Sequence, residues 1–199
     1  MSGGSYRRMS LMLGLLVLVA GCASPPPVRY YRLDAMELEP QATTGEPVVL
    51  ALGPMSFPDY LQRPQLVRRG AGAEVTVDEF HRWAEPLDEA VPRVLAVNVS
   101  ALADGVVVVP GTRRPLTPDY RLFGTVHRLD TDASGETVML VQWSISGRER
   151  TVVVAPKTTR YLSRATPADD PGAMAVAVSE VIGQFSRDIA GALETVRAP

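Results

Sequence analysis

Cysteine, histidine and lysine are scarce in this 199-residue sequence, which contains one cysteine, two histidines and, at position 157, a single lysine. One cysteine cannot form a disulfide within the chain. The sequence has no C-x-x-C, H-E-x-x-H or EF-hand pattern, and neither His81 nor His127 has a second ligand at metal-binding spacing. We therefore expect no metal site and no cofactor.

Motifs of catalysis are lacking as well, since the chain has no G-x-S-x-G nucleophile elbow. Gly70-Ala71-Gly72 begins like a nucleotide-binding loop, but it lacks the remaining residues of a P-loop, and a hairpin turn explains it better. The carboxylates of Asp169 and Asp170 precede a proline at an expected helix start, where acidic side chains act as caps. We expect no catalytic residues and no enzymatic activity.

An apolar run near the N-terminus has the form of a secretory signal. Arg7 and Arg8 precede it, the run covers residues 11–19, and the small residues of Val19-Ala20-Gly21-Cys22 follow. The run is shorter than the roughly 20 apolar residues that a membrane span requires. A cysteine directly after such residues resembles the lipobox of bacterial lipoproteins, in which the thiol receives a diacylglyceryl group. We predict a signal peptide over residues 1–21 and lipidation of Cys22, with acyl chains such as palmitate.

The mature chain is acidic once the signal peptide is removed. Loss of Arg7 and Arg8 leaves 18 of the 20 basic residues, and all 22 acidic residues remain, which gives a formal net charge of −4. A nucleic-acid partner requires a basic surface, so we expect no binding to nucleic acid.

The mature chain divides into a tether and one domain. Residues 22–27 contain three consecutive prolines and form a stiff spacer after the lipidated cysteine. Residues 28–199 have the length of a single domain. Strands are expected at 28–33, 48–52, 66–69, 74–77, 106–109, 120–130, 137–146 and 151–161, and helices at 87–102 and from Asp169 onwards. This order predicts a single three-layer α/β domain, in which a mixed β-sheet carries a helix on each face. Pro92 is expected to kink the first helix or to mark its start.

The least generic segment is a turn that is bracketed by two prolines, at positions 58 and 64. It presents Tyr60, Leu61, Arg63 and, just after it, Gln65. An arginine can pair with an acid or with backbone carbonyls, and a tyrosine can lie half-buried with its hydroxyl outside. Two interpretations follow, which are a structural corner and a docking surface for a partner.

Five short motifs are spread over nearly the whole mature chain. They are Tyr30-Tyr31-x-Leu33, Pro58-x-Tyr60-Leu61-x-Arg63-Pro64-Gln65-Leu66-Val67-x-Arg69, Arg82-Trp83-Ala84-Glu85-Pro86-Leu87, Arg93-Val94-Leu95-Ala96 and Asp119-Tyr120-Arg121-Leu122. In this order the motifs resemble the family of ABC-type transport auxiliary lipoproteins. The best-known member is the lipoprotein component of the paraquat-inducible intermembrane transport system, which is of the MCE type. Pro92 departs from the unbroken helix that the family is expected to have.

The resemblance implies an accessory lipoprotein of the outer membrane, anchored on the periplasmic face, with a three-layer α/β fold and no catalytic residues. Its implied partner is an MCE-domain protein that bridges the periplasm from an ABC transporter. Such systems move phospholipids between membranes and support envelope integrity, and some of these lipoproteins form homo-oligomeric rings. Ala23, in place of an aspartate after the cysteine, implies sorting to the outer membrane. The alternatives are an envelope-assembly or structural lipoprotein and a lipid-anchored periplasmic hydrolase.

Overall fold

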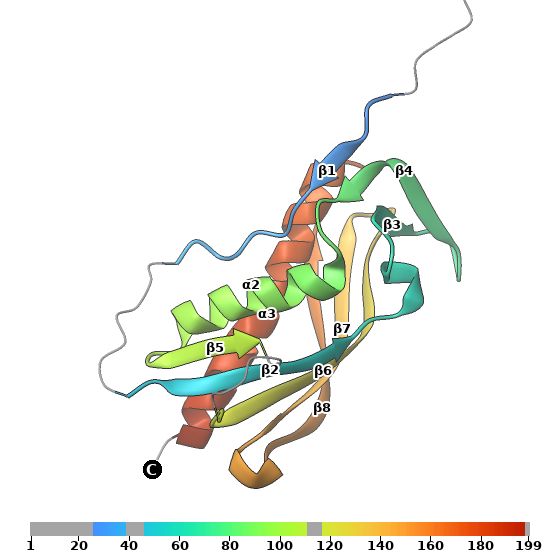
Figure 1. Cartoon of the computed structure of the whole chain (residues 1–199). Helices are drawn as coiled ribbons and strands as arrows, with labels where there is room; N and C mark the ends of the chain where they lie inside the picture. The colour runs from blue at the N-terminus through green and yellow to red at the C-terminus, as the bar shows by residue number, and fades with distance from the viewer. Residues whose placement is uncertain (1–25, 39–45, 111–116, 198–199) are drawn as a thin grey trace, which may run out of the picture.

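Eight strands form one mixed sheet in the part of the chain that the structure describes (Figure 1). The structure is a computed structural model, and it describes residues 26–38, 46–110 and 117–197. The strands are β1 (Arg29–Tyr31), β2 (Val48–Ser56), β3 (Gln65–Arg69), β4 (Val75–Trp83), β5 (Val106–Pro110), β6 (Tyr120–Asp132), β7 (Glu136–Ser146) and β8 (Val152–Arg164). The helices are α2 (Leu87–Leu102) and α3 (Pro171–Arg197), with short 3-10 turns η1 (Asp59–Leu61) and η2 (Arg148–Arg150).

The long strand β6 lies at the centre of the sheet. One edge pairs antiparallel with β7, which in turn pairs with β8. The other edge is shared, because β2 pairs in parallel with residues 120–125 and β3 pairs in parallel with residues 131–132. The sheet therefore forks, with β5 continuing beyond β2, and β4 and β1 continuing beyond β3. The chain between β2 and β3 passes the stretch of β6 that lies between the two pairings.

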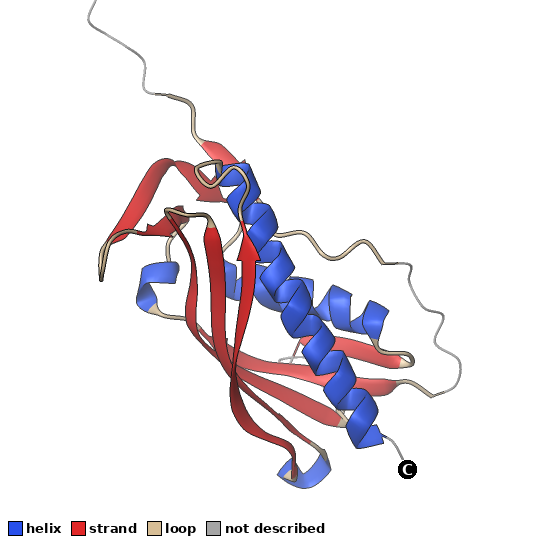
Figure 2. Cartoon of the chain, turned by 180° about the vertical axis from the view of Figure 1, so that it is seen from behind, coloured by secondary structure: helices blue, strands red, loops and turns tan. Residues whose placement is uncertain are grey.

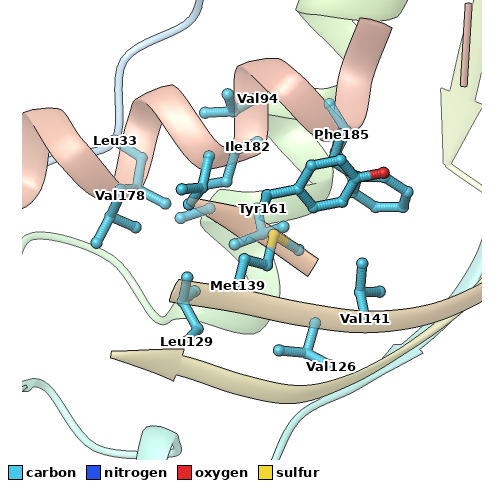
Figure 3. Close-up of a cluster of buried hydrophobic side chains, with 14 of the residues drawn as sticks. Leu33, Val94, Val126, Leu129, Met139, Val141, Tyr161, Val178, Ile182 and Phe185 are labelled. Atoms are coloured by element: carbon cyan, nitrogen blue, oxygen red, sulfur yellow. The ribbon is translucent and has the colours of Figure 1, made fainter. Parts of the chain in front are cut away.

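All the predicted strands and helices occur, and the single α/β domain with a mixed sheet is confirmed. Two strands are longer than predicted, because β2 continues past residue 52 to Ser56 and β4 continues past residue 77 to Trp83. The arrangement of layers differs from the prediction, because both helices cover the same face. The register places Leu52, Leu122 and Ile145 side by side on that face, and one core cluster joins them to both helices. In the close-up of Figure 3, residues of α3 and Val94 of α2 face the side chains of β6 and β7 from the same side.

The second face of the sheet is left largely without a covering layer. Along β6, Leu122, Gly124 and Val126 are buried, whereas the alternate Phe123 and His127 are exposed. Such alternation is typical of a sheet that is covered on one side only. The prediction of one helix on each face is therefore wrong.

Helix α2 begins at Leu87 and continues through Pro92, which neither starts nor ends it. Proline lacks the N–H that a helix interior uses, so this position leaves the carbonyl four residues earlier without its usual partner. Helix α3 begins as predicted, since Asp170 Oδ2 accepts a hydrogen bond of 2.6 Å from the backbone N–H of Ala173. No helix of the described ranges combines the length and apolar character that a membrane crossing requires.

Aromatic rings fill the space between α3 and the sheet. Trp83, Trp143 and Phe185 are buried, with exposed fractions of 6%, 1% and 0%. Phe185 packs its ring against Trp143 and against Tyr161, each with ring centroids 5.6 Å apart. Figure 3 shows Phe185 beside Tyr161. The apolar side of α3 therefore packs on the sheet.

Asn98 is a polar residue at the crossing of the two helices, which lie against each other in Figure 2. Its Nδ2 donates to Ser186 Oγ on α3 at 3.1 Å. Its Oδ1 accepts from the backbone N–H of Met36 at 2.8 Å, in the segment that follows β1. The side chain is 1% exposed, so this buried amide ties α2, α3 and the N-terminal segment together.

Candidate docking groove

The proline-bracketed turn fills the gap that the fork leaves beside β6. After Ser56 the chain leaves β6, and it returns when Arg68 pairs with Thr131. Within the turn, the backbone N–H of Leu61 donates to the carbonyl of Pro58 at 2.9 Å, which closes η1. The turn therefore replaces a missing length of strand beside β6.

Tyr60 anchors the turn to β6. Its hydroxyl accepts a hydrogen bond from the backbone N–H of Leu129 at 3.4 Å and lies 3.5 Å from Asp130 Oδ2. Arg128 holds that carboxylate from the other side, with Nε 2.8 Å from Asp130 Oδ1. Burial raises the pKa of Tyr60 above its ordinary value, and the charge of Asp130 adds to the rise. The hydroxyl of Tyr60 thus points inward to β6, whereas the sequence suggested that it would lie outside.

The other three predicted residues of the turn lie in different environments. Leu61 is 4% exposed and belongs to the core. Gln65 is partly buried, and its amide donates to Glu79 at 3.4 Å, within the β3–β4 hairpin. Arg63 is exposed. Of the four candidate docking residues, Arg63 is thus the one that the turn presents to solvent.

A groove of about 350 Å³ opens beside the turn, and residues from two distant motifs line it. Leu61, Arg63 and Pro64 come from the turn, and the second motif contributes its whole length from Arg82 to Leu87. The two motifs are joined directly, because the backbone N–H of Trp83 donates to the carbonyl of Pro64 at 2.6 Å. Motifs that were separate in the sequence therefore form one surface.

Arginine and apolar side chains share this groove. Arg82 has its Nε buried without a hydrogen-bond partner among the described residues, and Arg63 lies on the rim. Glu85 also lines the groove, but its carboxylate is engaged by Arg93 of α2. The hydrogen bond that Arg93 donates to Glu85 raises the pKa of Arg93, which also donates to the carbonyl of Leu33 at 3.1 Å.

The sequence-based selection missed part of the groove. Arg82 was noted as a motif residue but not as a neighbour of the turn, and Tyr30 and Phe57, which line the groove, were not singled out as site residues. The pairing of β1 with β4 places Tyr30 opposite Arg82. Nothing in the local sequence reports this pairing, because the two residues are far apart in the chain.

The lipidation site and the two histidines complete the residues that the sequence analysis considered. Cys22 and the predicted signal peptide 1–21 lie outside the described residues. His81 Nδ1 lies 2.8 Å from Asp78 Oδ2, so this histidine pairs with an acidic residue of its own strand, β4. His127 is exposed on β6. Across the described ranges, no three histidine, cysteine or acidic side chains gather where they could hold a metal ion.

Comparison with known proteins gives one family. A family model described as an ABC-type transport auxiliary lipoprotein component matches residues 31–190, which include both groove motifs. No curated protein matches the sequence of the chain.

Solved structures of low sequence identity share the fold. The chain is similar to a crystal structure of an uncharacterised protein, with a TM-score of 0.69 and 21% identity, over 84% of this chain and 99% of that one. It is similar to a protein from Xanthomonas campestris with a TM-score of 0.67 and 17% identity, over 84% and 96% of the two chains. A hypothetical protein from Chlamydia trachomatis has a TM-score of 0.50 and 9% identity, over 77% and 99%. At such identities the likeness concerns the fold alone.

Proposed function

Because the chain belongs to the family of ABC-type transport auxiliary lipoprotein components, we propose that it is the accessory lipoprotein of an MCE-type transport system that moves phospholipids between membranes. In this proposal the chain is no enzyme. It is held by the acyl chains of Cys22 in the outer membrane, facing the periplasm, and it docks the MCE-domain protein that bridges from the inner-membrane transporter. The order of the five motifs and the residue after Cys22 support this finer assignment.

The observation that carries the docking role is the convergence of two motifs on one groove. If these segments had only a structural role, all their motif residues would be buried in the core, as Leu61 and Trp83 are. Arg63 and Arg82 instead combine charge with an apolar groove wall, which is the composition of a binding-site centre. An arginine also suits a carboxylate or backbone carbonyl of a partner, because its planar fork donates two parallel hydrogen bonds.

The groove can be tested by charge reversal at its rim. Arg63→Glu should weaken co-purification with the MCE-domain protein of the same bacterium, because the substitution repels the acidic or carbonyl groups that an arginine binds. Arg69→Glu is the matched control, since Arg69 is also an exposed arginine and lies outside the groove lining. Both variants should keep the melting temperature of the unaltered protein. Equal loss of the partner in both variants would remove the groove from the proposal.

A photo-crosslinking side chain gives a test that does not depend on charge. Gln62 is exposed and lines the groove, so a benzophenone amino acid placed there should crosslink the MCE-domain protein in whole cells. The same residue at Thr76, exposed on the β3–β4 hairpin and outside the groove, should not. Capture of that partner from Thr76 but not from Gln62 would contradict docking at the groove.

A further inference from the structure

The position of β1 sets which end of the domain lies near the membrane. Val28, where the described chain approaches β1, is the sixth residue after Cys22. Even fully extended, six residues span only about 20 Å. The acyl chains of a lipidated Cys22 hold this residue at the bilayer surface, so Val28 lies within about 20 Å of that surface.

The length of helix α3 shows how far the other end of the domain lies from β1. Its 27 residues correspond to a length of about 40 Å. The helix starts beside β1, since a Cβ added to Gly172 would lie 3.8 Å from Tyr31. It ends beside the α2–β5 connection, where Arg197 donates to the carbonyl of Asp104 at 2.8 Å. Figure 1 shows β1 and the C-terminus at opposite ends of the molecule.

Exposed apolar side chains gather at the β1 end. Tyr30 is 64% exposed, Phe80 is 39% exposed and Val28 is 38% exposed. They are neighbours in space, because β1 pairs in parallel with β4 and Arg29 stands opposite His81, the residue after Phe80. Tyrosine and phenylalanine of this kind are costly to leave in water and are enriched where a protein meets the headgroup layer of a membrane.

The charges beside this patch also fit a lipid surface. Arg29 is exposed next to Tyr30, and its side chain carries the positive charge nearest to the patch on β1. Of the nearby acids, Asp34 pairs with Arg32 at 2.9 Å, Asp78 pairs with His81, and Glu79 accepts a hydrogen bond from Gln65 at 3.4 Å. The guanidinium of Arg29 can therefore face lipid phosphates.

We propose that the β1–β4 end of the domain rests on the bilayer that holds the lipid anchor, with Tyr30 and Phe80 in the headgroup layer and the guanidinium of Arg29 at the phosphates. The domain then stands on the membrane in a fixed orientation, with α3 leading away from it. The proposal requires the anchor at Cys22, which the proposed function shares, but it does not require the MCE partner. A failed partner-docking experiment would leave it unchanged.

Single cysteines report the orientation directly, because lipidation leaves Cys22 without a thiol. The mature lipidated chain carries Tyr30→Cys, Phe80→Cys or Val107→Cys, each labelled with the fluorophore NBD, and is added to preformed vesicles of phosphatidylethanolamine and phosphatidylglycerol. Val107 is the matched control, because it is 39% exposed like Phe80 but lies on β5, toward the other end of α3. NBD at positions 30 and 80 should emit at shorter wavelength and be bleached by external dithionite several-fold more slowly than at position 107.

Two results would overturn the proposal. In the first, dithionite bleaches all three positions at the same rate, which means that the domain has no preferred face toward the bilayer. In the second, the labelled Phe80→Cys chain is equally protected when it also carries Cys22→Ser and stays in solution without vesicles. That protection would come from a second copy of the chain and not from lipid.

Discussion

Asn98 is a single residue on which three segments of the chain depend. Asn98→Ala removes the acceptor for the Met36 N–H and the donor to Ser186, and it leaves buried polar groups without partners. The free energy of unfolding should fall by about 1–3 kcal/mol, which urea denaturation measures. Val97→Ala, at the neighbouring residue that is 50% exposed, should change it much less. Equal effects in the two variants would mean that the buried amide contributes little.

The environment of a single residue could be predicted only where it depends on the local spacing of apolar residues along a strand or helix. Trp143 and Phe185 belong to strands and helices whose apolar spacing shows which side faces the core. Tyr60 does not, because its inward hydroxyl depends on where β2 leaves β6 and where β3 rejoins it. That geometry is set by pairings between segments far apart in the sequence, and the local residues carry no sign of it.

Helix α3 is the element whose packing closes the core. Phe185→Ala removes the ring that contacts both Trp143 and Tyr161, and it should lower the free energy of unfolding by about 3–5 kcal/mol. Val176→Ala on the same helix is the control, since Val176 is 59% exposed and its truncation leaves no cavity. Thermal unfolding followed by circular dichroism compares the two variants. A similar melting temperature for both would contradict the packing described here.

The existence of the helices could be predicted, but the face of the sheet that they cover could not. An apolar stripe shows that one side of a helix is buried, and it does not say against which face. The alternation along β6 contained the answer, because Leu122 and Val126 are buried whereas Phe123 is exposed. A sheet with a helix on each face would have had apolar residues at both sets of positions.

On the scale of the whole molecule, the interior is filled by side chains of the two helices and the sheet. A groove of about 830 Å³ between α2 and β2 is open to solvent and lined in part by Val97 and Phe123. A phospholipid there would keep much of its acyl chain in water, which costs about 0.8 kcal/mol per methylene. The purified mature chain with Cys22→Ser should therefore retain no stoichiometric phospholipid on solvent extraction and mass spectrometry.

Retention of one phospholipid per chain would contradict this expectation and would make the protein a carrier. In that case Val97→Gln should release the lipid, because it places a polar group in the apolar wall of the groove. The unaltered chain and this variant should otherwise unfold at the same temperature, since Val97 is half exposed.

The candidate site was predictable in its parts but not as a whole. The turn with Arg63 and the segment from Arg82 to Leu87 were both singled out in the sequence. Their meeting depends on the hydrogen bond between Trp83 and Pro64 and on the pairing of β4 with β3, which are tertiary features. The two motifs can therefore be found in the sequence, whereas the surface that they form together can be found only in the structure.

The three-residue strand β1 has a mechanical consequence. If a partner pulls on the groove while the acyl chains hold Cys22, the tension passes through the pairing of β1 with β4. Only three residues on each strand share this load, from Arg29 with His81 to Tyr31 with Trp83. Behind them, Leu33 in the core and the Met36 contact to Asn98 form a second hold. Under force the domain would therefore yield first at β1, which lengthens the tether and takes Tyr30 out of the groove while the core stays folded.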